Sequence, residues 1–444
     1  MQPNKSRLDA AVAALQALLS FTGPADSTLK RFFREHALLG QQDRAFVAEV
    51  AFAVLRHMRL LEELGAQRSA RRLALGSLVV AFGMSVRELA PLLRGDEENW
   101  LTTLRTQTQT ELPPAVRFSL PDWLWERLLE QYGAEELERL SRGLLQQAPL
   151  DLRVNTQLAS RNEVLAQLAQ EGLGGSVTNL SPIGIRLQSK PALQKHPLFL
   201  SGKVEVQDQG SQLLTYLVTP RRRQMVVDFC AGAGGKTLAL GAMMHSEGRL
   251  YAFDTSERRL ANLKVRLKRS GLSNIHPQQI DSETDVRIRR LDGKIDRVLV
   301  DAPCSGFGTL RRNPDLKWRH NAESIAQMAR KQEAILQSAG RLLKPGGRLV
   351  YATCSLLREE NEQIVEQFLG RNPAFALVPA QDVMRGQNIE LDTGPYFRVF
   401  PHTHGMDGFF AAVMERDATK ATANAEAQRS AEDAEKNKTE SETG

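Results

Sequence analysis

The sequence predicts an α/β protein, in which a mostly parallel, doubly wound sheet follows a helical domain and a small α+β module. From Gln207 onward, apolar runs typical of buried strands alternate with helical patterns. A glycine-rich turn joins the first of these runs to the next helix, as in sheets that bind ligands at the carboxyl ends of their strands. The first hundred residues instead space apolar side chains three and four positions apart, which indicates amphipathic helices.

Four segments are expected along the chain. Residues 1–115 form the helical domain, where Asp43 is expected to cap the helix that begins at "RAFVAEVAF". Three prolines within residues 111–121 mark its end. Residues 116–206 hold linker helices and the α+β module, and residues 207–416 hold the large sheet. Residues 417–444 lack aromatic side chains and are expected to form a disordered tail.

The large sheet is predicted from four apolar runs, "QMVVDFC", "GRLYAFD", "IDRVLVDAPC" and "GRLVYATCS". Helical patterns separate them, among which "SERRLANLKVRLKRSG" and "SIAQMARKQEAILQSAGRLL" are the longest. Because each strand is followed by a helix, the strands are expected to run parallel with their carboxyl ends at one edge.

The composition indicates a globular cytoplasmic protein. The 444 residues are 42% apolar and 25% charged, and no run of about eighteen apolar residues could span a membrane. The amino terminus lacks a clean signal-peptide core. The chain has three cysteines and no C-x-x-C pair, which argues against a disulfide framework and against a metal site. No membrane partner and no obligate protein partner are expected.

The charge distribution favours a polyanionic partner. The net charge is +6, and Lys and Arg cluster in residues 221–224, 264–270, 287–290 and 311–312. Any one cluster is explained as well by a solvated helix face. Four clusters, which we expect near one site, favour nucleic acid.

The stretch "DFCAGAGGKT", residues 228–237, is the glycine-rich turn of the predicted sheet. A triphosphate-binding loop requires a glycine five residues before Gly235, where this chain has Cys230. A dinucleotide loop requires a third glycine at the position of Thr237. Neither pattern is complete, so the turn indicates backbone N–H groups close to some other ligand.

Two carboxylates favour S-adenosylmethionine (SAM) over ATP as that ligand. Asp254 ends the second predicted strand, twenty residues after Gly234, where a carboxylate accepts hydrogen bonds from ribose hydroxyls. Asp281 is placed where a third strand end would meet an adenine. Both carboxylates would repel a triphosphate, whereas SAM carries a sulfonium and no phosphate. For each Asp alone, a turn or helix cap is the plainer explanation.

Two of the three cysteines are predicted at the functional edge of the sheet. Cys304 follows one apolar strand and Cys354 follows another. A thiolate beside SAM suggests methylation of cytosine at carbon 5, because that carbon becomes nucleophilic only after a thiolate adds to carbon 6. The carbon 5 proton must then be removed and the thiol eliminated. Two small buried residues are the alternative.

Residues 207–416 resemble the catalytic domain of the RNA cytosine-5 methyltransferases of the ribosomal small-subunit methyltransferase B (Sun/Fmu) type. The matching segments are "VQDQGSQL", "DFCAGAGGKT", "DAPCSGFGTLRRNPDLKW", "YATCSLLREENEQIV" and "HGMDGFFAAV". The resemblance implies a Rossmann-like class I methyltransferase domain, SAM as cofactor and RNA as partner. Residues 1–115 more loosely resemble the family's NusB-like RNA-binding domain, most closely at "DRAFVAEVAFAVLRHM".

The resemblance also implies roles for individual residues. Cys354 is the nucleophile, Cys304 assists product release, and Asp301 stands near both the methionine end of SAM and the target base. The usual loop has Ala-Pro where this chain has Gly232 and Ala233, which loosens the turn. The implied SAM contacts are Cys230, Ala231, Gly232, Ala233, Gly234, Gly235, Lys236, Asp254, Asp281 and Asp301.

We therefore expect a SAM-dependent RNA cytosine-5 methyltransferase that acts on 16S rRNA. Arg311 and Arg312 would hold the RNA backbone, and Phe307 and Trp318 are candidates for stacking on bases, with core packing as the alternative for Trp318. The target could instead be tRNA or another RNA. A non-catalytic RNA-binding assembly factor and an assembly ATPase are the other classes; the intact cysteine pair argues against the first and Cys230 against the second.

Overall fold

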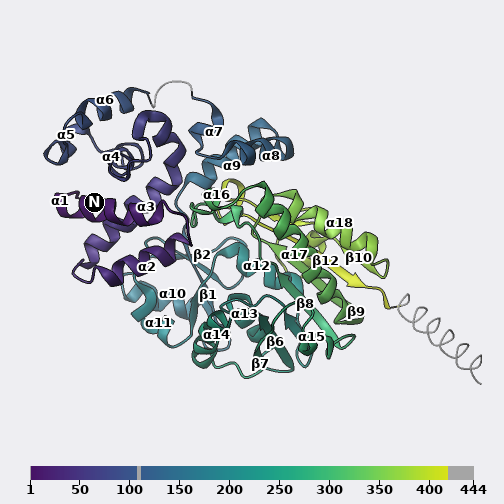
Figure 1. Ribbon diagram of the computed structural model, residues 1–444. Helices are drawn as coiled ribbons and strands as arrows, with labels where there is room; N and C mark the ends of the chain where they lie inside the picture. The colour runs from purple at the N-terminus through teal and green to yellow at the C-terminus, as the bar shows by residue number, and fades with distance from the viewer. Residues whose placement is uncertain (1, 108–111, 419–444) are drawn as a thin grey trace, which may run out of the picture. The chain divides into compact units, whose positions relative to one another are not determined.

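The computed structural model describes residues 2–107 and 112–418, so most of the expected tail lies outside the described residues (Figure 1). The chain forms two compact units. The helical unit comprises residues 1–148, 305–325 and 401–403, and the sheet unit comprises residues 149–304, 326–400 and 404–444. This division differs from the four segments expected from sequence, because residues 116–148 and 305–325 pack with the amino-terminal helices. Among the described residues, no helix has both the length and the apolar character needed to cross a membrane.

The helical unit is built on one apolar core, to which the long helix α3 contributes Val47, Val50 and Val54. Gly40, rather than Asp43, occupies the N-cap of α3. Asp43 lies in the first turn and accepts a hydrogen bond from the Gly40 N–H at 3.2 Å, as the second half of a capping box. The helices are α1 Lys5–Leu18, α2 Ala25–Glu35, α3 Gln41–Leu61, α4 Ala70–Val80, α5 Val86–Leu89, α6 Glu97–Gln107, α7 Pro114–Arg117, α8 Asp122–Tyr132 and α9 Ala134–Leu145.

Residues 305–325, which include the short helix α16 (Leu316–Arg319), belong to the core of the helical unit. The Trp318 indole donates to the Leu55 carbonyl at 2.7 Å. Phe307 has no exposed surface, and Arg311 is also buried. The expected base-stacking role of Phe307 and RNA-backbone role of Arg311 are therefore wrong, because both side chains are buried. Trp318 takes the core-packing alternative, since it packs against the core of the helical unit.

The sheet unit begins with a small antiparallel sheet in the order β2-β3-β1-β4. Leu152, Ile185 and Val204 from three of its strands share a core with Val164 and Leu168 of helix α10. The elements are β1 Leu150–Val154, α10 Arg161–Gln170, β2 Gly175–Val177, β3 Gly184–Leu187, α11 Pro197–Leu200 and β4 Val204–Val206.

The large sheet has the order β10-β12-β9-β8-β5-β6-β7, with β11 paired to β12. Strands β9, β8, β5, β6 and β7 are parallel, and β12 and β10 extend the sheet antiparallel. This confirms the expected mostly parallel α/β fold. The strands are β5 Met225–Asp228, β6 Arg249–Asp254, β7 Ile275–Gln279, β8 Ile295–Asp301, β9 Leu343–Thr353, β10 Phe375–Val378, β11 Phe397–Val399 and β12 Phe409–Arg416.

Helices cover both faces of the large sheet, and alternate side chains of a strand serve different cores. Val226 of β5 lies in one apolar core, and its neighbour Val227 lies in the other. Edge strand β7 did not stand out from sequence as an apolar run, because "IHPQQ" is mostly polar and only Ile275 is fully buried. The helices are α12 Gln209–Val218, α13 Gly235–Met243, α14 Glu257–Ser270, α15 Val286–Arg289, α17 Ala322–Arg341, α18 Glu362–Arg371 and α19 Ala380–Arg385, and α20 is Pro401–His404.

Candidate functional site

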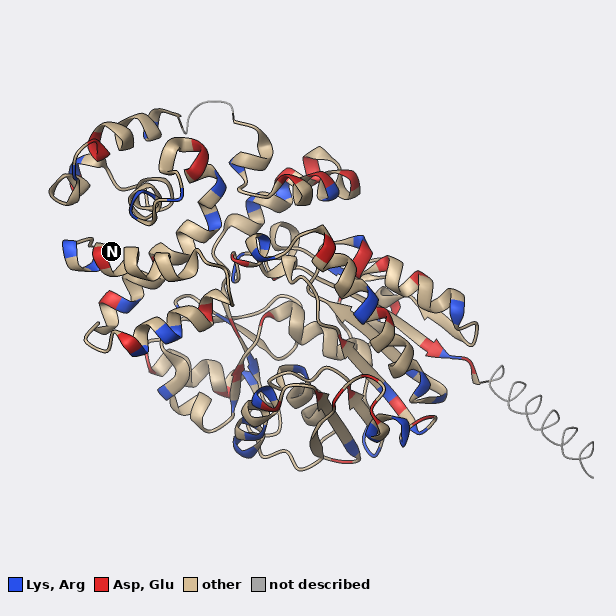
Figure 2. Cartoon of the chain, viewed as in Figure 1, with Lys and Arg blue, Asp and Glu red and all other residues tan. Residues whose placement is uncertain are grey.

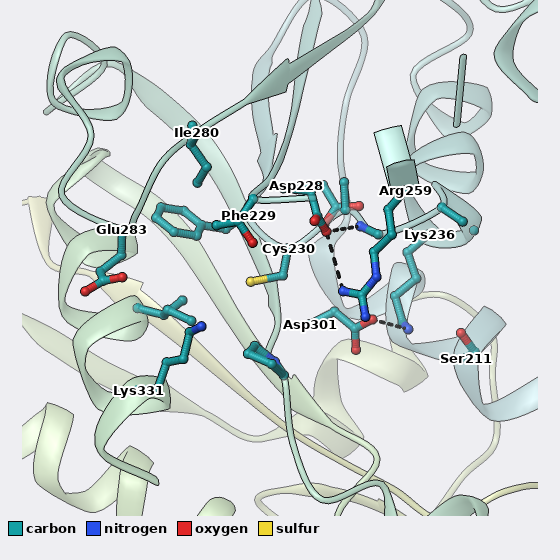
Figure 3. Close-up of a pocket in the computed structure, with 18 of the residues that line it drawn as sticks. Ser211, Asp228, Phe229, Cys230, Lys236, Arg259, Ile280, Glu283, Asp301 and Lys331 are labelled. Carbon is teal, nitrogen blue, oxygen red and sulfur yellow. Dashed lines mark hydrogen bonds and ion pairs between the residues drawn. The ribbon is translucent and has the colours of Figure 1, made fainter. Parts of the chain in front are cut away.

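A cavity of about 540 Å³ opens at the carboxyl ends of β5, β6 and β8 (Figure 3). Parallel strands place the residues that follow them at this common edge, as the sequence predicted. The cavity is large enough for a nucleoside-sized ligand. Its lining is Val206, Gln207, Ser211, Asp228, Phe229, Cys230, Ala231, Gly232, Ala233, Gly235, Lys236, Asp254, Thr255, Arg259, Arg266, Ile280, Asp281, Ser282, Glu283, Asp301, Pro303, Lys331 and Ile335.

The glycine-rich turn forms one wall of the cavity. Gly234 does not line the cavity but caps α13 with φ +85°, and a Cβ there would lie 2.1 Å from Leu263 Cδ1. The turn is closed by a hydrogen bond from the Gly234 N–H to the Ala231 carbonyl at 2.9 Å. A left-handed conformation with no room for a side chain explains why glycine is needed at this position.

Asp254 is held rigidly at the end of β6. Its Oδ2 accepts from the Gly232 N–H at 2.9 Å, and its Oδ1 accepts from the Ser256 N–H at 2.7 Å. Each carboxylate oxygen retains a second lone pair. Because Asp254 also lines the cavity, these lone pairs suit the hydroxyls of a ribose.

Asp281 lies at the rim rather than deep in the cavity. Its side chain is 83% exposed, and one of its oxygens lies 3.2 Å from Arg287 Nη2. It lines the same cavity as Asp254, as the sequence predicted. Its exposure and its ion pair leave it a weaker determinant of ligand affinity than Asp254.

Asp228 is a cavity residue that the sequence reasoning missed. It ends β5, and its Oδ2 accepts from the Thr237 hydroxyl at 2.7 Å. Burial raises the pKa of this carboxyl from 3.8 to about 7. Its position at the end of the first strand, directly before the glycine-rich turn, was the signal that could have identified it.

Lys236 and Asp301 form an ion pair at one side of the cavity, with 2.7 Å between Nζ and Oδ2 (Figure 3). Burial disfavours the ammonium, but the Asp301 carboxylate outweighs burial, so the pKa of Lys236 is raised. The ammonium also lies 5.6 Å from the centre of the Phe409 ring. Lys236 is therefore a charged, oriented hydrogen-bond donor.

Cys304 and Cys354 meet next to each other, with 3.4 Å between their sulfur atoms. Cys354 directly follows β9, and Cys304 lies three residues after the end of β8. Both thiols are free and partly exposed. The hydrogen bond to Cys354 and burial raise the pKa of the Cys304 thiol well above its ordinary value. Two adjacent free thiols just after the carboxyl ends of β8 and β9 suit covalent catalysis better than core packing.

The third cysteine, Cys230, lines the cavity within the glycine-rich turn. Burial raises the pKa of its thiol well above the ordinary value. A thiol held neutral is a poor nucleophile, so Cys230 is suited to contact a ligand and not to attack one.

The structure separates the basic clusters that we expected near one site. Arg221 to Arg223 precede β5, so they lie at the amino edge of the sheet, opposite the cavity. That expectation was wrong because neighbouring sequence positions can lie at opposite ends of a strand. Helix α14 carries six basic residues and one acid, and from it Arg259 and Arg266 line the cavity (Figure 2).

The chemistry of the cavity fits SAM better than a nucleoside triphosphate. Its lining holds five acidic and four basic side chains, and the basic Lys236 and Arg266 are paired with Asp301 and Glu205, so the cavity lacks the excess of cations that a triphosphate needs. The Asp254 geometry suits a ribose, and Phe229, Ile280 and Ile335 offer apolar walls for a base. The fold and the cavity together define a class I SAM-dependent methyltransferase.

Comparison with known proteins identifies the family. The profile of the 16S rRNA methyltransferase RsmB/F family matches residues 215–415, and that of the ferredoxin-like domain of RsmF/B-like methyltransferases matches residues 120–194. A relative from Citrobacter koseri named ribosomal RNA small subunit methyltransferase B is 31% identical over 415 residues, which cover 85% of this chain and 91% of the relative. The chain belongs to the RsmB/F methyltransferase family.

Another relative and two solved structures are also similar to this chain. A Synechocystis protein named probable ribosomal RNA small subunit methyltransferase B is 36% identical over 310 residues, or 69% of each chain. The crystal structure of PH0851 is 26% identical with a TM-score of 0.76 and covers 94% of this chain and 100% of its own. The structure of NSun6 from Pyrococcus horikoshii with SFG, a SAM analogue, shares the fold at 21% identity and a TM-score of 0.59, over 67% of this chain and 98% of its own.

Proposed function

We propose that this protein methylates carbon 5 of a cytosine in 16S rRNA. The observation that carries the proposal is the pair of free thiols 3.4 Å apart, Cys304 and Cys354, at the edge of the sheet that holds the SAM cavity. The names of the relatives support rRNA of the small subunit as substrate. An rRNA substrate is consistent with a cytoplasmic location.

Cys354 is the nucleophile in this proposal. Its sulfur adds to carbon 6 of the target cytosine, and the electron pair of the 5,6 double bond makes carbon 5 nucleophilic. SAM supplies an electrophilic methyl group on its sulfonium. After methylation, the carbon 5 proton is removed, the double bond re-forms, and the Cys354 sulfur leaves.

Cys304 assists this last step. Its raised pKa favours the arrangement in which Cys304 carries the proton and the Cys354 sulfur accepts the hydrogen bond. By giving its proton to the departing Cys354 sulfur, Cys304 becomes a thiolate that can accept the carbon 5 proton, so the two transfers together leave both thiols neutral. Asp301 and Lys236 form the polar side of the same site and would bind the face of the base where charge develops.

Nine of the ten residues proposed to hold SAM line the cavity, and the tenth, Gly234, shapes the glycine-rich turn. Backbone N–H groups of the glycine-rich turn approach the cofactor, Asp254 binds its ribose, and Asp281 faces the adenine from the rim. The full proposed set is Cys230, Ala231, Gly232, Ala233, Gly234, Gly235, Lys236, Asp254, Asp281 and Asp301.

RNA contacts are proposed for the basic face of α14 and for residues 1–115, which we interpret as a NusB-like RNA-binding domain. On α14, Arg258, Lys264 and Lys268 are exposed to solvent. Phosphate contacts from such residues would make RNA affinity fall steeply with salt. We propose no obligate protein partner.

The two cysteine variants test the chemistry. In Cys354→Ala neither methyl transfer nor a covalent protein–RNA complex should form. In Cys304→Ala attack persists but release slows, so a covalent complex should accumulate after methylation. Denaturing gels with labelled RNA measure both outcomes, and RNA with uridine at the target position is the control. A complex trapped by Cys354→Ala alone would reverse the assignment.

The RNA target is tested separately. Mapping of 5-methylcytosine in total RNA from a strain without the protein should show a loss in 16S rRNA. A loss in tRNA alone would redirect the proposal to another RNA. Unchanged methylation throughout would favour a non-catalytic RNA-binding role.

A further inference from the structure

The two cysteine loops are joined by one buried side chain from a helix. Gln332 of α17 has no exposed surface. Its Nε2 donates to the carbonyl of Pro303 at 2.9 Å and to Glu360 Oε1 at 3.0 Å. Pro303 is the residue directly before Cys304, so this first bond fixes the backbone from which the Cys304 thiol projects.

The second bond leads to the other thiol. Glu360 is fully buried, and its Oε2 accepts a hydrogen bond from the hydroxyl of Ser355. Ser355 directly follows Cys354, and its oxygen also accepts from the Leu357 N–H at 3.0 Å. The loop that carries Cys354 is therefore folded around the carboxylate that Gln332 binds.

The Pro303 carbonyl and the Glu360 carboxylate fix the orientation of the Gln332 amide. An amide nitrogen carries two hydrogens, and here two acceptors face it, one from each loop. The reverse orientation of the Gln332 amide would place its oxygen against both acceptors. A glutamine fits this position because a shorter, apolar or acidic side chain could not donate to both.

We propose that Gln332 is a positioning residue that sets the distance between the two thiols and so couples nucleophilic attack to product release. The inference rests on the proposed function for its catalytic consequence. Its structural part, the fixed approach of Cys304 to Cys354, stands independently of any reaction.

The structural part is tested without RNA or SAM. Diamide oxidises two neighbouring thiols to a disulfide and is itself reduced to the hydrazine, taking up their two protons and two electrons. The Cys304–Cys354 disulfide is then followed by peptide mapping. Gln332→Leu should slow its formation about thirtyfold, because it removes two hydrogen bonds that are each worth about 1 kcal/mol. Gln337→Leu is the matched control, since Gln337 lies on the same helix and accepts from Asn372.

Equal rates for Gln332→Leu and the unaltered protein would overturn the proposal, as would equal slowing by Gln337→Leu. Neither result depends on whether the protein methylates RNA. Failure of the proposed function would appear instead as full methylation activity in Cys354→Ala.

A swap of the two side chains separates the two loops and guards against misfolding of Gln332→Leu. In the double variant Gln332→Glu with Glu360→Gln, the amide at position 360 can donate to the carboxylate at position 332 and still accept from Ser355. The Pro303 carbonyl, however, loses its donor. The swap should restore the hydrogen bonds that hold the Cys354 loop, but the Cys304 loop should remain without its bond to position 332.

Two RNA substrates distinguish these effects. RNA with 5-fluorocytidine at the target has no carbon 5 proton to lose, so its covalent capture reports attack and methyl transfer alone. The swap should capture it within about twofold of the unaltered protein, while release of native RNA slows about fivefold, as expected for one lost hydrogen bond of about 1 kcal/mol. Normal release by the swap variant would show that the Gln332–Pro303 bond does not position Cys304.

Discussion

Lys236 and Asp301 come from the first turn of α13 and the end of β8, yet Lys236 Nζ lies 2.7 Å from Asp301 Oδ2. Both side chains line the cavity between the glycine-rich turn and β8. A partly buried pair of this kind has a structural role and, in our proposal, a catalytic one. The two roles can be separated, because removing one charge and removing both have different consequences.

Lys236→Met should therefore destabilise the protein by roughly 1–3 kcal/mol, less than for a fully buried pair because the Asp301 side chain is 31% exposed. The double variant Lys236→Met with Asp301→Asn should recover most of that stability, since no unpaired charge remains. Neither the single nor the double variant should methylate RNA. Chemical unfolding and methyl-transfer assays give the two readouts, and activity in the double variant would exclude a catalytic role for the pair.

Asp254→Ala should weaken SAM binding by roughly 1–3 kcal/mol, because ribose hydroxyls would lose their acceptor. Asp281→Ala should have a smaller effect, since Asp281 is largely exposed and paired with Arg287. Calorimetry with SAM measures both, and ATP should bind neither the variants nor the unaltered protein. Tight ATP binding without SAM binding would contradict the cofactor geometry.

Gly234→Ala should destabilise the protein by roughly 2–3 kcal/mol and weaken SAM binding, because it forces both a positive φ and a collision with Leu263. Gly232→Ala is the matched control. Gly232 also has a positive φ, +56°, but a Cβ there meets no atom within 4 Å. The loss of stability caused by Gly232→Ala should stay at about 1 kcal/mol. Equal losses in thermal unfolding would show that space around Gly234 is not the cause.

Asp228 gives the protein a pH-dependent stability. Folding raises the pKa of its carboxyl from 3.8 to about 7 because the group is buried. The contribution of Asp228 to the stability of the folded protein is therefore most favourable below pH about 4 and is lost as the pH rises towards 7. Asp228→Asn should be more stable than the unaltered protein at pH 8, by up to about 4 kcal/mol, and the gap should close near pH 4. A gap that does not change with pH would contradict the raised pKa.

The main sheet and its functional edge could be predicted because local patterns determine them. Apolar runs separated by helices imply parallel strands, and parallel strands bring their carboxyl ends together. Asp254, Cys304 and Cys354 were for that reason expected at one edge, where the structure places them. Strand β7 was harder to see because an edge strand needs few apolar residues.

The sequence by itself determined the fold class, the glycine-rich turn and the family, because each depends on residue types at short, fixed spacings. Only the tertiary structure decided which side chains are buried and which distant loops meet. Trp318 entered the core of the helical unit, and Gln332 came to join the loops of Cys304 and Cys354. No sequence motif marks such a helical residue. Its role depends on contacts with Pro303 and Glu360, which lie 29 and 28 residues away in the sequence and are brought together only by packing.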